Sequence, residues 1–324
     1  MVRSRISGTG SFVPKKVVTN HDLERIVDTS DGWISSRTGI RERRVSVSET
    51  TAVMAAKAAR NALKSAKVSP KEIDLVIVGT VTPEMTFPST ACLVQSELGI
   101  RSGSAAFDVS AACSGFLYAI DAADKYIRAG SAKKALVIGV DRFSRIIDWN
   151  DRSTCVLFGD GAGAVVLTAE EGHRGILLSD IHSDGRHWDM LFAPGSIQPC
   201  HFEEKAFNDY YVKMNGNETF KLAVRTMGKA ITDAVGGAGL TTRDIALLIP
   251  HQANIRIINA TQERLKLPPE RVFTNIEKYG NTSAGSIPLA LDEAVRAGRV
   301  KDDDIVVLVS FGGGLTWGAA VIRW

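Results

Sequence analysis

The sequence predicts an α/β fold made of two similar halves fused head to tail. Short runs rich in Val and Ile alternate with longer helical patterns along the chain. Continuous apolar runs of this kind are typical of strands that helices cover on both faces. In addition, one helix-to-strand unit recurs, because residues 62–77 and 234–249 share one spacing, with Ile73 matching Ile245. The alternative is coincidence, since α/β units resemble one another.

The individual elements follow in chain order from the same patterns. Strands are expected at residues 73–78, 105–109, 135–140, 162–167, 245–249, 305–309 and 319–322. Alanine-rich amphipathic helices are expected at about residues 51–66, 114–129, 220–235 and 287–297. Each half also ends on a Gly/Ala-rich turn and a strand, at 159–167 and 312–322. We therefore divide the chain into halves at 1–170 and 171–324.

Composition excludes several classes of protein. The 324 residues are 44% hydrophobic and 23% charged with a net charge of +3, which argues against disorder. No apolar run approaches the roughly 18 residues that span a bilayer, and the basic N-terminus lacks the apolar core of a signal peptide. The four cysteines are too few for a disulfide scaffold and lack zinc-binding CxxC spacing. We expect a soluble, cytoplasmic protein with no metal and no nucleic-acid or membrane partner.

One segment departs from the α/β pattern. Residues 182–214 are rich in Trp, Phe, Tyr and Pro and show no clear period. Loops of this length inside a compact domain are usually functional or disordered. The aromatic side chains argue against disorder, so this segment is expected to have a function.

Cys113 is the first candidate for chemistry. It follows the strand at 105–109 and the small residues 110–112, and it begins a helical pattern that Gly130 ends. A helix N-terminus favours an anion, so this position is expected to lower the pKa of the thiol and make it a nucleophile. The alternative is a small buried apolar residue, the reading that we give to Cys92, Cys155 and Cys200.

Three further candidates lie at comparable strand ends. His251 follows the strand at 245–249, at the edge where open α/β sheets place their sites. Asn281 stands just before an apolar helix, and the glycines at 312–314 end another strand and can bring backbone N–H groups close to an oxyanion. Alone, each has an ordinary explanation as a turn or cap residue. Cys113 and His251 come from different halves, as a site on a pseudo-two-fold axis would require.

With these residues the sequence resembles the β-ketoacyl-acyl-carrier-protein synthase III family of the thiolase superfamily over essentially its whole length. The resemblance is carried by motifs in a fixed order: residues 28–34 and 37–43, Asp108 to Phe116, Phe158 to Ala164, His251-Gln252-Ala253-Asn254, Gly280 to Ala284, and Phe311 to Gly318. This resemblance implies a thiolase-like fold whose pseudo-symmetric halves stack in α-β-α-β-α layers.

The resemblance also implies a reaction. Members of this family condense an acyl-CoA primer, here expected to be acetyl-CoA, with malonyl-acyl carrier protein and so start fatty acid synthesis. Cys113 would carry the acyl group, with its oxyanion held by the N–H groups of Cys113 and Gly313. His251 and Asn281 would hold the enolate that decarboxylation generates, so neither a carboxylate base nor a cofactor is required.

Substrate-binding roles are implied in the same way. Trp33 and Arg152 would flank the CoA adenine, Arg37 would meet a CoA phosphate, and Asn217 and Asn254 would bind the pantetheine arm. Phe87 would reach across a homodimer interface into the partner's acyl pocket, where Leu191 from the segment at 182–214 is the expected wall. Lys221 and Arg256 would form a basic rim for the acidic carrier protein.

Three rival functions remain open at this stage. A related condensing enzyme of secondary metabolism, such as a starter-unit or alkylquinolone synthase, would use the same triad. A cysteine hydrolase shares the order Cys, His, Asn, but the local signature of papain-like proteases is absent around Cys113. A non-catalytic binding scaffold is disfavoured by the complete set of Cys113, His251 and Asn281.

Overall fold

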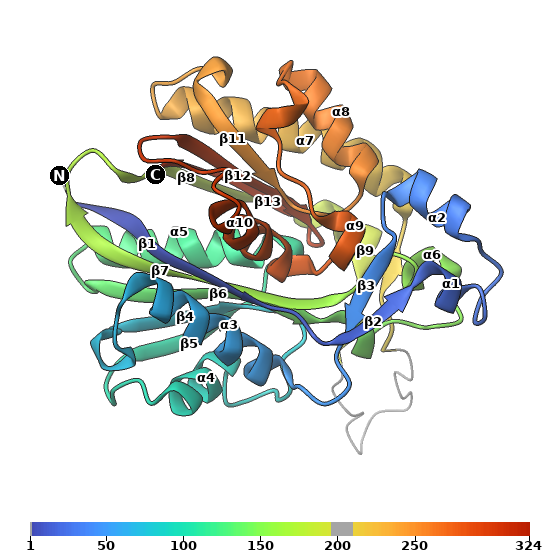
Figure 1. Ribbon diagram of the computed structural model, residues 1–324, viewed down its shortest axis with the longest axis horizontal. Coiled ribbons are helices and arrows are strands. Elements are labelled where there is room, and N and C mark those ends of the chain that lie inside the picture. Colours follow the sequence, from blue (N-terminus) through green and yellow to red (C-terminus); the bar gives the residue numbers. More distant parts are fainter. Residues whose placement is uncertain (1, 196–209) are drawn as a thin grey trace.

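The computed structural model describes residues 2–195 and 210–324, and these residues form five layers. Two helices lie between two sheets, and further helices cover each outer face (Figure 1). The helices of the layers are α3 (Thr51–Ala66) and α4 (Thr90–Leu98) outside, α5 (Gly115–Arg128) and α10 (Ser286–Arg296) in the centre, and α7 (Gly216–Gly237) and α8 (Ile255–Leu265) on the far side. The predicted α-β-α-β-α fold is confirmed.

The two sheets have matching topologies. The first sheet contains, in spatial order, β1 (Val2–Phe12), β7 (Asp160–Glu171), β6 (Lys134–Arg142), β4 (Leu75–Gly79) and β5 (Ala105–Val109). The second contains β8 (Gly175–Ser183), β13 (Thr316–Arg323), β12 (Ile305–Gly312) and β11 (Ile245–Pro250). In each sheet parallel strands are followed by antiparallel ones. Strand β4 pairs in parallel with both β5 and β6 in the first sheet, and β11 pairs in parallel with β12 in the second, while β7 and β13 add to β6 and β12 in the antiparallel direction.

The register shows how closely the halves correspond. Leu75 of β4 pairs with Ala135 of β6, and Leu247 of β11 pairs with Val306 of β12. A short 3-10 turn precedes each unit, η1 (Pro70–Glu72) before β4 and η5 (Thr242–Asp244) before β11, and both turns carry a capping box. The repeat around Ile73 and Ile245 is therefore real, while the boundary at residues 170 and 171 stays a prediction.

Most expected elements are found within a few residues of their predicted bounds, but some were missed. The largest omissions are β1, α8 and the hairpin of β2 (Lys16–Thr19) with β3 (Glu42–Val45). Also missing from the expected elements are helix α4, strand β8, the short helices α1 (Asn20–Leu23), α2 (Asp31–Thr38), α6 (Arg152–Cys155) and α9 (Ile276–Tyr279) and the 3-10 turns η3 (Phe143–Arg145) and η6 (Pro269–Arg271). The segment at 182–214 begins in β8 and continues as η4 (Gly185–Met190) and a hairpin of β9 (Leu191–Phe192) with β10 (Lys213–Met214). Cys200 lies outside the described residues.

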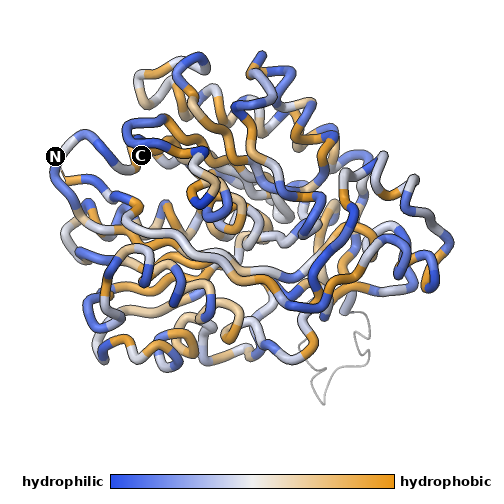
Figure 2. The backbone as a smooth tube through the Cα atoms, viewed as in Figure 1, coloured by the Kyte–Doolittle hydropathy of each residue, from blue (hydrophilic) through white to orange (hydrophobic). Residues whose placement is uncertain are grey.

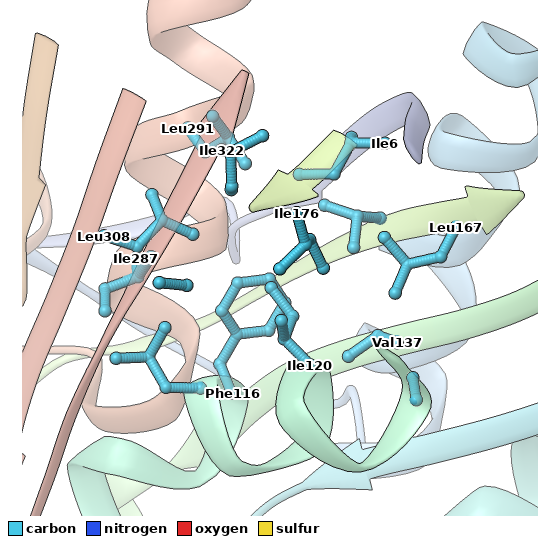
Figure 3. Packing of buried hydrophobic residues seen from close by; sticks show 14 of the residues in the cluster. Ile6, Phe116, Ile120, Val137, Leu167, Ile176, Ile287, Leu291, Leu308 and Ile322 are labelled. Atoms are coloured by element: carbon cyan, nitrogen blue, oxygen red, sulfur yellow. The ribbon is translucent and has the colours of Figure 1, made fainter. Parts of the chain in front are cut away.

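The core between the sheets fixes the position of the two central helices. Phe116 and Ile120 of α5 pack with Ile287 and Leu291 of α10, and all four are almost fully buried (Figure 3). Apolar residues of both sheets close the cluster, and the hydropathy colouring shows them concentrated in the strands inside the molecule (Figure 2). Among the described residues, no helix is long and apolar enough to cross a membrane.

The alanine-rich composition of α3 has a structural reason. Helix α3 lies directly on β1, where Gly8 and Gly10 face it, and a Cβ added to Gly10 would overlap the backbone of Ala62. Glycines on the strand and alanines on the helix therefore allow the two backbones to approach more closely than larger side chains would permit.

Gly10→Ala tests this close approach. The added methyl group must displace α3, so the free energy of unfolding should fall by about 1–3 kcal/mol. Gly236→Ala on α7 is the control, because a Cβ there meets nothing within 4 Å, and it should be neutral or stabilising by up to about 1 kcal/mol. Urea unfolding of both variants measures the difference, and equal stabilities would contradict the proposed contact.

Candidate active site

One cavity of about 140 Å³ brings together the three residues that the sequence singled out. Cys113 from the first half and His251 and Asn281 from the second half line it together. All three are at least nine-tenths buried, and the rest of the lining is largely apolar, including Leu191, Phe220 and Phe311. The expected convergence of polar residues from two halves is therefore present in the structure.

Cys113 lies in a tight turn at the start of a central helix. The 3-10 turn η2 (Ala112–Ser114) follows β5 and leads directly into α5, and Ala112 has a left-handed φ of 46°. The Ser310 hydroxyl donates a hydrogen bond of 2.8 Å to the Cys113 carbonyl, which ties the turn to β12. Among the described residues the Cys113 N–H donates to no backbone carbonyl, and it interacts with the sulfur of its own side chain.

The expectation of a low thiol pKa is wrong for the resting protein. Burial raises the pKa of Cys113 to about 12, the nearby Asp141 carboxylate also raises it, and the Ser283 hydroxyl opposes this shift. The desolvation of a thiolate inside the closed cavity thus outweighs the favourable helix N-terminus. Cys113 is a thiol at neutral pH and needs a proton acceptor to become a nucleophile.

His251 is uncharged in the resting protein. Its backbone N–H donates to Val309 across the parallel strands, at 2.8 Å, which holds the residue at the end of β11. Burial lowers the pKa of the imidazole to about 3, so the ring is uncharged at neutral pH. Its buried Nδ1 has no hydrogen-bond partner among the described residues.

Asn281 is held by its backbone on both sides. Its N–H donates to Leu157 and its carbonyl accepts from Gly159, at 2.9 and 3.0 Å, so the residue is bridged to the first half of the chain. Its side-chain Oδ1 accepts from the Ser283 N–H at 2.8 Å. The Nδ2 donors are therefore the part of the amide that is left for a ligand.

The glycine loop approaches Cys113 closely. Gly312 lies so near that a Cβ on it would stand 2.8 Å from the Cys113 nitrogen. The neighbouring Gly313 lies against the Leu191 carbonyl, where a Cβ would come within 2.5 Å. Only glycine fits these two positions, which explains the run at 312–314 and places the Gly312–Gly313 backbone beside the candidate nucleophile.

The residues predicted to bind the CoA adenine are in direct contact with each other. The Arg152 guanidinium carbon lies 4.6 Å from the centroid of the Trp33 ring, and that of Arg37 lies 5.3 Å away. Arg152 also donates to the Asp28 carbonyl at 2.6 Å. A flat base needs about 7 Å between two flanking groups, so Trp33 and Arg152 occupy the expected slot themselves.

The other predicted contact residues divide into two groups. Asn254 lines the cavity and caps α8 by accepting from the Arg256 N–H, whereas the exposed Asn217 lines a separate shallow pocket nearby. Arg256 lies over the ring of Phe220, which lines the cavity, so its charge is close to the opening. Lys221 is exposed and pairs with Glu218 at 2.8 Å.

A second cavity of about 550 Å³ also reaches Cys113. Leu191 lines both cavities, together with Phe158, and the flanking residues 192–195, Tyr210 and Val212 line the larger one. The segment at 182–214 thus contributes to a space beside Cys113. Phe87 is 83% exposed and does not line the cavity of its own chain, although its neighbours at 81–86 do.

Sequence reasoning missed two residues beside Cys113. Asp141 at the end of β6 is fully buried, and its carboxylate accepts a hydrogen bond from the Ala284 N–H. Ser283 has a left-handed φ of 50° and contacts both Cys113 and Asp141. The sequence did contain one indication of Asp141, because a charged residue near the end of a buried strand often belongs to a site.

Comparisons with known proteins agree with this site. Models of 3-oxoacyl-[acyl-carrier-protein] synthase III and of its C-terminal part match residues 107–185 and 236–324. The β-ketoacyl-[acyl-carrier-protein] synthase III of Alkalilimnicola ehrlichii is 55% identical over the full length of both chains. The crystal structure of 3-oxoacyl-[acyl-carrier-protein] synthase III from Aquifex aeolicus superposes with a TM-score of 0.93 at 51% identity, covering 99% of this chain and 100% of the other. That from Thermus thermophilus gives 0.93 at 47% identity, covering 99% of each chain. This chain therefore belongs to the β-ketoacyl-acyl-carrier-protein synthase III family.

Proposed function

We propose that this protein condenses an acyl-CoA primer with malonyl-acyl carrier protein and releases 3-oxoacyl-acyl carrier protein, the first condensation of fatty acid synthesis. Acetyl-CoA is the primer to test first. The observation that carries the proposal is the single buried cavity lined by Cys113, His251 and Asn281. Family membership supports the same reaction, because the similar proteins bear this enzyme's name over their full length.

In the first half-reaction the Cys113 sulfur attacks the thioester carbonyl of the primer. Since burial keeps the thiol protonated, its proton passes to the neutral His251, and the CoA thiolate takes that proton when the carbon–sulfur bond to CoA breaks. The oxyanion formed on the way is bound by the N–H groups of Cys113 and Gly313. The Cys113 N–H supports this assignment, because among the described residues no backbone carbonyl accepts from it.

In the second half-reaction the malonyl group loses its carboxylate as carbon dioxide. The electron pair of the broken bond forms an enolate, whose oxygen accepts hydrogen bonds from His251 and from Nδ2 of Asn281. The enolate carbon attacks the acyl group on Cys113, and the carbon–sulfur bond to Cys113 breaks. Burial of the two neutral donors strengthens their interaction with the negative oxygen.

The pantetheine chains of CoA and of the carrier protein enter the cavity from the side of α7 and α8. The CoA adenine takes the place of Arg152 on the Trp33 ring, with Arg37 near a phosphate and Asn217 and Asn254 along the pantetheine. The exposed Lys221 and Arg256 attract the acidic carrier protein. Phe87 of a second copy closes the acyl pocket in a homodimer, a role supported by its exposure.

A condensing enzyme of secondary metabolism is the alternative function. The decisive experiment incubates the protein with a series of acyl-CoA primers and malonyl-carrier protein, with products identified by mass. We expect a 3-oxoacyl-carrier protein two carbons longer than the primer. Release of free acid instead would indicate a hydrolase, and condensation only with a different extender would indicate the secondary-metabolism function.

The first prediction concerns the nucleophile. Acetyl-CoA alone should add one acetyl group to the protein, and Cys113→Ala should abolish this addition, because only a thiol in the cavity can reach the thioester. Intact-protein mass spectrometry with peptide mapping measures it. Cys92→Ala and Cys155→Ala are controls, since neither residue lines the cavity, and acetylation at either one would remove the central assignment.

The second prediction separates the half-reactions. Asn281→Ala removes one donor to the enolate, so condensation should fall by about 100-fold or more. Self-acylation of Cys113 should be affected much less, because the amide does not take part in it. His251→Ala should impair both steps, since His251 also accepts the thiol proton. Equal losses of both steps in Asn281→Ala would contradict its assignment.

The third prediction tests the basic rim. Arg256→Glu should raise the KM for malonyl-carrier protein and leave self-acylation by acyl-CoA nearly unchanged, because an exposed charge acts mainly on encounter with the partner. Added salt should raise the KM for malonyl-carrier protein more in the wild-type protein than in the variant. Salt screens the attraction that only the wild type has, since the Debye length is only about 8 Å at physiological ionic strength. Steady-state kinetics at two salt concentrations measure this effect. If acyl-CoA were affected as strongly as carrier protein, Arg256 would not be a docking residue.

A further inference from the structure

A buried carboxylate beside the active site has no part in the reaction just described. Asp141 lies near the end of β6 with an exposure of 0%. Its Oδ1 accepts from three donors that follow β4: the Val81 N–H at 2.8 Å, the Thr82 hydroxyl at 2.9 Å and the Thr80 hydroxyl at 3.1 Å. Its Oδ2 accepts from the Ala284 N–H at 3.1 Å.

The pseudo-symmetry gives this carboxylate a counterpart in the other half. The pairing of Leu75 with Ala135 and of Leu247 with Val306 aligns β6 with β12, so that Asp141 occupies the position of Gly312. The turns that precede the two central helices correspond as well, because η2 (Ala112–Ser114) and η7 (Ser283–Gly285) both begin with a left-handed residue. In this correspondence Ala284 takes the place of Cys113.

The two equivalent places are filled differently. Beside Cys113 the strand residue is Gly312, which leaves no room for a side chain, and in the described part of the chain no carbonyl accepts from the Cys113 N–H, which interacts only with its own sulfur. Beside Ala284 the strand residue is Asp141, whose carboxylate binds the Ala284 N–H. A backbone N–H at a helix start attracts an anion. One turn therefore remains open to a substrate oxyanion, whereas the other is already bound by a carboxyl oxygen of the protein itself.

The bound turn carries Asn281. Its Oδ1 accepts from the Ser283 N–H, and the next N–H along the chain, that of Ala284, is the one that Asp141 binds. Asp141 in turn is fixed by its three donors after β4. Hydrogen bonds on either side of the short backbone segment 283–284 thus connect the end of β4 to the Asn281 amide.

We propose that Asp141 is a positioning residue for Asn281, which fixes the turn at 281–284 so that the Asn281 amide points at the enolate. The inference rests on the proposed role of Asn281 in condensation. It assigns Asp141 no contact with the substrate. Self-acylation depends on the Cys113 turn, which Asp141 does not bind.

Asp141→Asn tests the proposal with almost no change of shape. The asparagine Oδ1 can keep the three donors after β4, and its Nδ2 then faces the Ala284 N–H, so two donors meet and this link is lost. We expect kcat of condensation to fall by about 10- to 100-fold, as small misplacements of catalytic groups do. The KM for malonyl-carrier protein should stay within about threefold, and self-acylation should be no slower.

Asp292→Asn is the matched control. Asp292 is a buried carboxylate on α10 that accepts from Thr9, Ser11 and Arg296 instead of from the turn that carries Asn281. Asp292→Asn should lower the melting temperature, but it should not slow condensation more than self-acylation. If Asp141→Asn does not fold, Thr80→Val removes one donor from the Asp141 carboxylate and should slow condensation selectively by about threefold.

The outcomes distinguish this inference from the proposed function. Loss of condensation with preserved self-acylation in Asp141→Asn supports positioning. Equal loss of both half-reactions, or normal condensation, overturns it. Asn281→Ala is measured alongside: if it condenses normally, the proposed role of Asn281 fails, whereas if it is crippled while Asp141→Asn is normal, only the inference about Asp141 fails.

Discussion

The site depends on the close contact between the two turns that start α5 and α10, where the halves of the chain meet. Small residues make this contact possible: a Cβ on Gly115 would lie 3.4 Å from the Ala284 Cβ, and one on Gly139 of β6 would overlap the Ala284 carbonyl. Because neither half can place Cys113, His251 and Asn281 alone, catalytic geometry follows from how tightly these backbones approach. The large apolar cluster around α5 and α10 holds them in this arrangement.

Burial at this contact determines the chemistry as much as geometry does. It keeps the Cys113 thiol and the His251 imidazole uncharged, so the pair begins the reaction as a neutral acid and a neutral base. A site of this kind avoids the desolvation cost of a resting ion pair and creates charge only when a thioester is present. Hydrogen-bond donors fixed in advance then act on that charge without having to reorganise.

Much of the fold and the site could be predicted from the sequence, for identifiable reasons. Helix α3 has a clear helical period, and β4 and β11 are continuous apolar runs. His251 follows β11, and Cys113 follows β5. Strand β1 was missed because its glycines and small polar residues serve the contact with α3 rather than a strand pattern. The raised pKa of Cys113 and the partners of Asp141 could not be predicted, because they depend on segments that are distant in sequence.

The contact between Arg152 and Trp33 has a consequence for the order of events. In the proposed CoA site, the arginine that stacks on Trp33 competes with the adenine for the ring, because both groups bind an aromatic face. Apparent affinity for CoA is reduced by the fraction of molecules in which the ring is covered. In the proposed reaction this competition favours the departure of free CoA after acylation. It does not oppose the second substrate, because a carrier protein delivers its pantetheine without an adenine.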